Sequence, residues 1–163
     1  MCKEKETANI VVIKPKCEYA VNPIGLDTNA PRFSWVIKAL ERGAGQSAYQ
    51  ITVTGPCGKV VWDSGKVLSD NSVNISYNGQ QLASRSRYEW KLKVWDKNGL
   101  LYEAPEINTF ETAMMSSSEW KAQWIRGKNL FRKEYNISKK VVNSRIYICG
   151  LGYYVLHING RKV

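Results

Sequence analysis

The sequence contains little histidine and cysteine, and it has no long apolar run. One histidine and four cysteines occur among 163 residues. The cysteines lack the spacing of metal ligands, and one histidine cannot complete a Cys/His set, so we expect no metal site. The cysteines also lack a paired framework, so packing must hold the core. No run of about twenty apolar residues occurs, and we expect no membrane-spanning helix.

The N-terminal residues carry charge but no apolar stretch, which argues against a signal peptide in the sequence as written. Cys2 directly follows Met1 and opens a polar tether over residues 1–15. This arrangement fits a lipid-modified cysteine, the one membrane contact we consider, and hence a periplasmic or cell-surface protein. An ordinary polar terminus fits equally well, and a cytoplasmic location then stays open.

The net charge of +10 is concentrated near the C-terminus. Residues 1–113 carry 14 basic and 12 acidic side chains, whereas residues 114–163 carry 10 and 2. A basic surface attracts polyanions such as acidic polysaccharides. The distribution favours instead an incomplete module whose acidic complement lies beyond residue 163. We expect no nucleic acid partner, because the basic residues are not interleaved with exposed aromatic ones.

Apolar and polar residues alternate over most of the chain, which predicts β-strands. The expected strands, about seven before residue 113, lie near residues 17–19, 32–37, 49–54, 60–62, 73–77, 88–94 and 107–112. Asp96-Lys97-Asn98-Gly99 predicts a hairpin turn, since Asn and Gly accept positive φ. Residues 16–113 are therefore expected to form a fibronectin type III-like antiparallel β-sandwich.

Three aromatic residues are expected in the core of this sandwich. Trp35, Tyr88 and Trp90 all lie on the apolar side of their alternating segments. Tyr88 also opens a long strand after a Ser/Arg-rich loop, which is the position of the corner tyrosine in such sandwiches.

The pattern of residues changes after a polar linker, residues 114–118. Alternation near residues 131–137, 146–148 and 156–158 predicts further strands. Asn159-Gly160 is a strong hairpin signal, but only three residues follow it, so we expect the return strand to be missing. So few strands cannot close a barrel or jelly roll. We interpret residues 119–163 as the truncated start of a jelly-roll-like accessory domain, an incomplete β module.

Eight sequence blocks, in this order, resemble the bacterial α-L-rhamnosidases, a group of glycoside hydrolases. They are NPIGLD at 22–27, PRFSW at 31–35, QSAYQI at 46–51, VWDSGKV at 61–67, YEWKLKVWD at 88–96, WKAQWI at 120–125, FRKEY at 131–135 and GLGYYVLHING at 150–160. The resemblance covers nearly all of residues 16–163. It implies a fibronectin-like sandwich followed by a jelly-roll accessory domain, with an inverting (α/α) barrel later in the chain.

The resemblance thus implies the non-catalytic N-terminal accessory region of an enzyme that releases terminal α-L-rhamnose from plant glycans or glycosides. Its implied partners are the catalytic barrel and the remaining accessory domains of the full-length enzyme. No catalytic residue is carried over, because the positions of the family's catalytic motif do not occur here. This fragment alone is expected to be inactive.

The residues themselves offer few candidates for chemistry. Asp27, Asp63 and Asp96 each lie beside an apolar strand, where hydrogen bonding in turns is the expected role of Asp. His157 lies on a strand with no nearby partner in sequence, so we expect a structural role. Gly150-Leu151-Gly152 lacks the following Lys and Ser/Thr of a phosphate loop, and we expect no cofactor.

Two tryptophans are candidates for binding. Trp95 is out of phase with the apolar residues of its strand, and Trp62 has no clear phase. Either could stack on a sugar ring or dock against a neighbouring domain. Two alternatives to the accessory role therefore stay open: an independent carbohydrate-binding module for a rhamnose-containing or acidic polysaccharide, and an adhesion or polyanion-binding β-domain.

Overall fold

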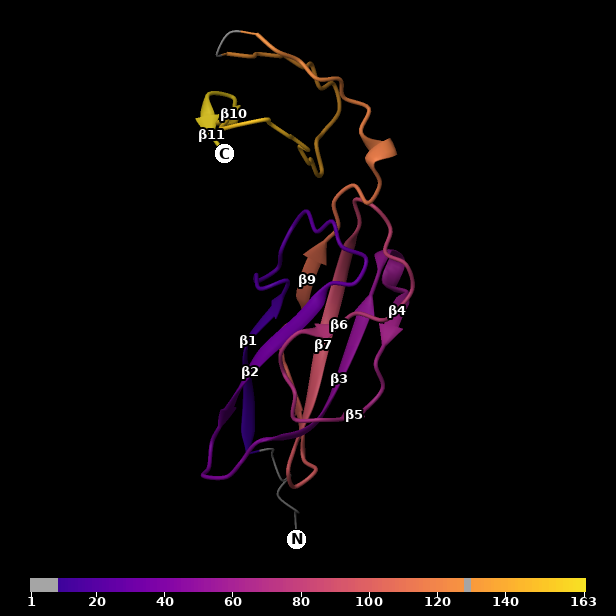
Figure 1. The fold of residues 1–163 in the computed structure, drawn as a ribbon, viewed down its shortest axis with the longest axis vertical. Helices are drawn as coiled ribbons and strands as arrows, with labels where there is room; N and C mark the ends of the chain where they lie inside the picture. The colour runs from indigo at the N-terminus through magenta and orange to yellow at the C-terminus, as the bar shows by residue number, and fades with distance from the viewer. Residues whose placement is uncertain (1–8, 128–129) are drawn as a thin grey trace. The chain divides into compact units, whose positions relative to one another are not determined.

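The computed structural model describes residues 9–127 and 130–163 (Figure 1). Cys2, the candidate for lipid modification, lies outside the described residues. The chain divides into two units, the first ending at Ala122 and the second covering Gln123–Val163. In the described part of the chain, no helix has the length and apolar character needed to cross a membrane.

The first unit is built from two antiparallel sheets whose strands run along its long axis (Figure 1). The smaller sheet has the order β1 (Ile10–Cys17), β2 (Arg32–Ala39), β6 (Ile75–Ser76). The larger sheet has the order β4 (Val60–Asp63), β3 (Gln46–Thr54), β7 (Arg87–Asp96), β8 (Leu101–Glu103). In addition, β5 (Val67–Leu68) pairs with β3 and β9 (Asn108–Glu111) pairs with β7. The expected sandwich fold is confirmed.

Short 3-10 helices flank these sheets, η1 (Pro56–Gly58) after β3 and η2 (Ser117–Glu119) after β9. The turn between β7 and β8 lies where Asp96-Lys97-Asn98-Gly99 predicted a hairpin, and Gly99 has a φ of 80°. Two short strands, β5 and β8, were not expected from the sequence. The strand expected over residues 73–77 is reduced to β6.

The core consists of the inward side chains of both sheets. Trp35, Tyr88 and Trp90 are buried, as expected, and the Phe33 ring lies 4.7 Å from that of Trp90. Burial of each large apolar side chain contributes roughly 1.5–3 kcal/mol. Tyr88 also accepts a hydrogen bond at its hydroxyl from the Ala83 N–H, at 2.8 Å. This bond back to the preceding loop confirms the corner tyrosine.

The N-terminal tether expected over residues 1–15 is wrong from Ile10 onward. Ile10 and Val12 are buried core residues, and β1 pairs with β2 along its whole length apart from one irregularity. The strand expected near residues 17–19 ends at Cys17 because Glu18 and Tyr19 have φ values of 45° and 65°, which are not strand conformations.

In the second unit, two of the expected strands do not form. Residues 131–137 and 146–148 have no strand conformation, and no described residue from 123 onward is buried. Here the structure contains a hairpin, β10 (His157–Ile158) and β11 (Arg161–Lys162). Asn159 and Gly160 form its turn with φ values of 50° and 78°. The return strand that we expected to be missing is therefore present, over two residues.

Candidate binding surface

The larger sheet of the first unit has one face toward the core and one face outward. On β3, Tyr49, Ile51 and Val53 belong to the core, so the residues between them lie on the outer face. On β7, Trp90 and Val94 point inward. Tyr88 and Leu92 do the same, so the alternate positions between them, which include Lys91, Lys93 and Trp95, belong to the outer face.

An apolar row crosses this outer face over four strands, and we call Leu68, Ala48, Trp95 and Leu101 the apolar row. Ala48 of β3 pairs with Leu68 of β5 on one side and with Trp95 of β7 on the other, and Trp95 pairs with Leu101 of β8. The pairing of β3 with β7 is regular from Ala48 to Thr54, and a β-bulge between Gln46 and Ala48 interrupts it next to the row. Residues paired in this way share a face.

The members of the apolar row differ in exposure. Ala48 is fully buried although it faces outward, whereas Leu68 is 82% and Leu101 44% exposed. Trp95 is half-buried, and the Lys66 Nζ lies 4.4 Å from the centroid of its ring. An ammonium placed over an indole face at an exposed site gains about 0.5–1 kcal/mol. The out-of-phase position of Trp95 therefore corresponds to an outward side chain.

A polar row lies next to the apolar row on the same face, and it consists of Gln50, Lys93, Glu103 and Asp63. Gln50 pairs with Lys93, and Lys93 pairs with Glu103. The Lys93 Nζ lies 2.8 Å from the Glu103 Oε1, and this hydrogen bond holds the pKa of Glu103 below its usual range. The Gln50 amide donates to the Asp63 Oδ1 at 2.8 Å. The row thus consists of polar side chains that hold one another in pairs.

Trp62, the second candidate, lies on the other face of the sheet. It pairs with Val53, a core residue, and its ring lies 6.0 Å from Phe33 and 5.2 Å from Tyr77. Trp95 and Trp62 are therefore not brought together. The packing of Trp62 favours a structural role.

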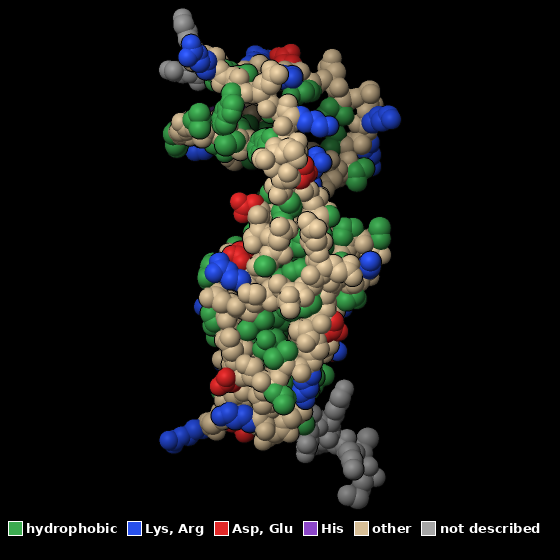
Figure 2. Space-filling view, turned by 45° about the vertical axis from the view of Figure 1, so that its right-hand side comes forward, with side chains coloured by type: hydrophobic (Ala, Val, Ile, Leu, Met, Phe, Trp, Pro, Cys, Tyr) green, Lys and Arg blue, Asp and Glu red, His purple; other side chains and the backbone are tan. Residues whose placement is uncertain are grey.

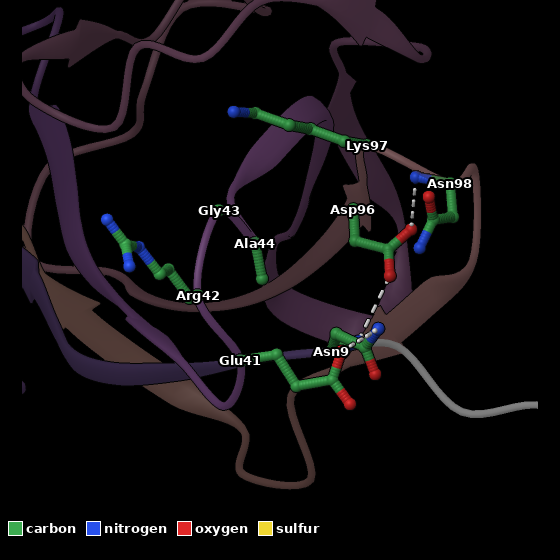
Figure 3. Close-up of a pocket in the computed structure, with 8 residues that line it drawn as sticks. All are labelled: Asn9, Glu41, Arg42, Gly43, Ala44, Asp96, Lys97 and Asn98. Carbon is green, nitrogen blue, oxygen red and sulfur yellow. Dashed lines mark hydrogen bonds between the residues drawn. The ribbon is translucent and has the colours of Figure 1, made fainter.

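A cavity of about 200 Å³ lies at the end of the sandwich where β1 begins (Figure 3). Figure 3 shows the carboxylate of Asp96 between Asn9 and Asn98, while the side chains of Arg42 and Lys97 extend away from it. The Asp96 Oδ2 accepts from the Asn9 N–H at 3.0 Å, and the Oδ1 accepts from the Asn98 N–H at 2.9 Å. Asp96 is therefore engaged in holding the turn, the role expected of it.

The other candidates for chemistry are dispersed. Asp27 and His157 are exposed, and Asp63 accepts from the Gly65 N–H at 2.8 Å, again a turn contact. Burial raises the pKa of the Cys17 thiol to about 12, with a smaller contribution from the charge of Glu18. Among the described residues, no group of three or more His, Cys, Asp or Glu side chains could hold a metal ion.

Comparison with known proteins identifies close similarity to parts of larger enzymes. The family model described as "Rha78A-like, N-terminal immunoglobulin domain" matches residues 12–116. A protein of Formosa agariphila named alpha-L-rhamnosidase is 35% identical over an alignment of 178 residues, which covers 87% of this chain and 19% of that protein. A protein of Streptomyces avermitilis with the same name is 42% identical and covers 70% of this chain and 12% of that protein.

Solved structures give the same result. The crystal structure of Streptomyces avermitilis alpha-L-rhamnosidase complexed with L-rhamnose matches with a TM-score of 0.67 and 40% identity, over 72% of this chain and 12% of that one. The alpha-L-rhamnosidase from Dictyoglumus thermophilum matches with a TM-score of 0.64 and 40% identity, over 72% and 14%. The chain thus spans less than a fifth of the length of these relatives.

Proposed function

The chain belongs to the family of Rha78A-like N-terminal immunoglobulin domains, and from this premise we propose that it is the non-catalytic N-terminal accessory region of a longer α-L-rhamnosidase. That enzyme would release terminal α-L-rhamnose from plant glycans or glycosides. Its catalytic barrel and remaining accessory domains would be the partners of this region. Residues 119–163 would be the start of the next accessory domain.

The observation that carries this proposal is the extent of the match. The family model covers the sandwich, and the named alpha-L-rhamnosidases align with this chain over only 12% to 19% of their own length. The carboxylates of the sandwich support the same role. Asp96 and Asp63 each accept hydrogen bonds from backbone N–H groups of turns, so their oxygens are engaged in holding the fold.

Side-chain contacts hold the chain in place where it leaves the sandwich after β9. Glu119 accepts a hydrogen bond from the Ser84 hydroxyl and lies 3.6 Å from the Arg85 guanidinium. The Ser84 hydroxyl also accepts from the Met115 N–H at 3.0 Å, and Ser116 forms a capping box with Glu119. The polar linker is therefore bonded to the sandwich as far as residue 119. A linker that is held in this way suits a region that positions the next domain of the enzyme.

The exposed apolar side chains of residues 123–163 also support the proposal. Tyr153, Val142 and Leu151 are each more than nine-tenths exposed. Soluble domains bury such side chains against further strands. In the proposed enzyme, later residues of the accessory domain would cover them.

Hydrolysis of a chromogenic α-L-rhamnoside tests the proposal. The 163-residue chain is compared with the chain extended to the end of its gene, at equal molar concentration. We expect release of the chromophore by the extended chain alone. Activity in the short chain, or in neither form, would contradict the proposal.

A further inference from the structure

We propose that the outer face of the larger sheet around Trp95 binds an anionic glycan, a chain of sugar rings that carry carboxylates. The proposal rests on the proposed function for the choice of carbohydrate as ligand class, and it adds the site and the charge of the ligand. Its residues are the apolar row, the polar row, and two lysines, Lys66 and Lys91. All of them lie within the sandwich.

The apolar row supplies the surface on which a sugar ring packs. The indole of Trp95 is an aromatic face within this row, and the apolar CH groups of a pyranose pack against such faces. Leu68 and Leu101 extend this surface to both sides of Trp95. Because neighbouring strands lie ~4.8 Å apart, the row spans roughly 14 Å across four strands. It therefore offers room for more than one ring.

The polar row supplies groups that can form hydrogen bonds with the hydroxyls of a sugar ring packed on the apolar row. It lies two residues along β3 and β7 from the apolar row, roughly 7 Å away. Lys93 and Glu103 are held by their ion pair, and Gln50 is held by Asp63. Groups held in place lose little freedom when a ligand binds, which favours affinity.

The charges on this face favour a carboxylate on the ligand. Three lysines, Lys66, Lys91 and Lys93, lie on the outer face with three carboxylates, those of Asp63, Glu89 and Glu103. Lys93 is paired with Glu103, and the charge of Lys91 also acts on the Glu103 carboxylate, whereas Lys66 has no ion-pair partner among the described residues. This leaves the Lys66 ammonium, next to Trp95, available to a ligand.

Lys66 places a positive charge directly at the aromatic surface on which a sugar ring would stack. Its ammonium lies over the Trp95 ring, and its side chain is exposed and can leave the ring. A sugar ring that replaces Lys66 on the indole would place its carboxylate beside the displaced ammonium. A neutral sugar would have to break the contact of Lys66 with the ring without this compensation.

General attraction of polyanions does not explain the arrangement. On the visible face of the sandwich, Lys and Arg side chains lie apart from one another with Asp and Glu between them (Figure 2). A nucleic acid site would be expected to combine a continuous basic groove with several exposed aromatic rings. The local combination around Trp95 suits a glycan better.

Binding to the 163-residue chain tests the inference directly. Calorimetric titration with oligogalacturonate is compared with titration using the same oligomer after its carboxylates have been reduced to alcohols. Variants are Trp95→Ala and Lys66→Ala. The matched controls are Lys38→Ala and Val36→Ala, exposed positions on the outer side of the smaller sheet.

We expect Trp95→Ala to weaken oligogalacturonate binding at least tenfold and Lys66→Ala to weaken it several-fold, with a shallower salt dependence. The control variants should bind as the parent chain does, and the reduced oligomer should bind more weakly. Thermal unfolding of each variant shows whether it is folded. If Trp95→Ala does not fold, the Lys66→Ala comparison decides the question.

Four results would overturn the inference: no binding of oligogalacturonate, equal weakening by Lys66→Ala and Lys38→Ala, tighter binding of the reduced oligomer, or self-association of the chain that Trp95→Ala abolishes. The last two would assign the face to a neutral glycan or to a second copy of the chain. The titration needs no catalytic activity, and the hydrolysis of a small rhamnoside needs no glycan-binding face. Failure of this inference and failure of the proposed function are therefore distinguishable.

Discussion

Replacement of Asp96 by Asn should destabilise the sandwich through one lost contact between distant parts of the chain. The Oδ2 of Asp96 accepts from the Asn9 N–H at 3.0 Å, and the Oδ1 accepts from the Asn98 and Leu100 N–H groups at 2.9 Å each. The side chain thus joins the start of β1 to the hairpin between β7 and β8. An amide keeps one oxygen for the hairpin and presents its NH₂ group to the Asn9 N–H.

The magnitude follows from the number and charge of these bonds. A hydrogen bond to a charged group contributes about 1.5–3 kcal/mol, and Asp96 is only 1% exposed, so water cannot replace the lost acceptor. We expect Asp96→Asn to lower the free energy of unfolding at pH 7 by about 2 kcal/mol. For a domain of this size, that corresponds to a decrease in Tm of roughly 8 °C.

The same contact makes stability depend on pH. Burial alone would raise the pKa of Asp96, but hydrogen bonds from the Asn9, Leu100, Asn98 and Gly99 N–H groups outweigh it and hold the pKa below its usual range. A lowered folded-state pKa means that the contribution is complete above the unfolded value, about 3.9. It is lost as the pH falls through the folded-state pKa. The stabilities of the parent chain and the variant should therefore converge below about pH 4.

Urea denaturation followed by tryptophan fluorescence, at pH 7 and again near pH 3, measures both effects. Asp70→Asn is the control, because Asp70 is an exposed carboxylate. A variant as stable as the parent at pH 7 would refute the reasoning. So would a difference that persists unchanged at the lower pH.

Two further substitutions test the packing of the sandwich. Tyr88→Phe leaves the Ala83 N–H without its acceptor and should cost about 1–3 kcal/mol in urea denaturation; an unchanged midpoint would contradict the corner role. In Gly79→Ala, the new Cβ would lie 2.5 Å from both the Trp62 Cβ and the Tyr77 Oη, so a loss of about 1–3 kcal/mol is expected. A Gly79→Ala chain that unfolds at the parent temperature would show that this contact has been misjudged.

The main strands of the sandwich could be predicted because their inward residues are large and strictly alternate. Phe33 and Trp35 on β2 and Tyr88 and Trp90 on β7 give such a pattern. The beginning of β1 could not be found in this way, because residues 10–13 are continuously apolar and show no alternation. Strands of two residues, such as β5, depend on a partner strand rather than on their own sequence.

The candidate surface was only partly visible in the sequence. Trp95 could be assigned to an outer face from its phase alone. Leu68 and Leu101 could not, because the short strands β5 and β8 were not expected and because Leu68 joins the row only by pairing with Ala48 of β3. The contact with Lys66 depends on the same register.

The second unit shows where alternation misleads. Residues 131–137 alternate well, but a strand also requires a neighbour that takes its backbone hydrogen bonds and a layer that covers its apolar side. No described residue of this unit is buried, and residues 131–137 are not paired in a sheet, so neither requirement is met there. The hairpin at Asn159 and Gly160 forms nevertheless, because its turn conformation is local.

Removal of the sandwich from the longer enzyme tests the accessory role most directly. Turnover of a small chromogenic α-L-rhamnoside and the temperature of inactivation are measured with and without the sandwich, which begins at Ile10 and is removed through residue 113. We expect turnover within a few-fold of the complete enzyme and a lower inactivation temperature. Loss of turnover in a shortened enzyme that remains folded, with its inactivation temperature unchanged, would contradict the account, because the sandwich would then contribute to the chemistry.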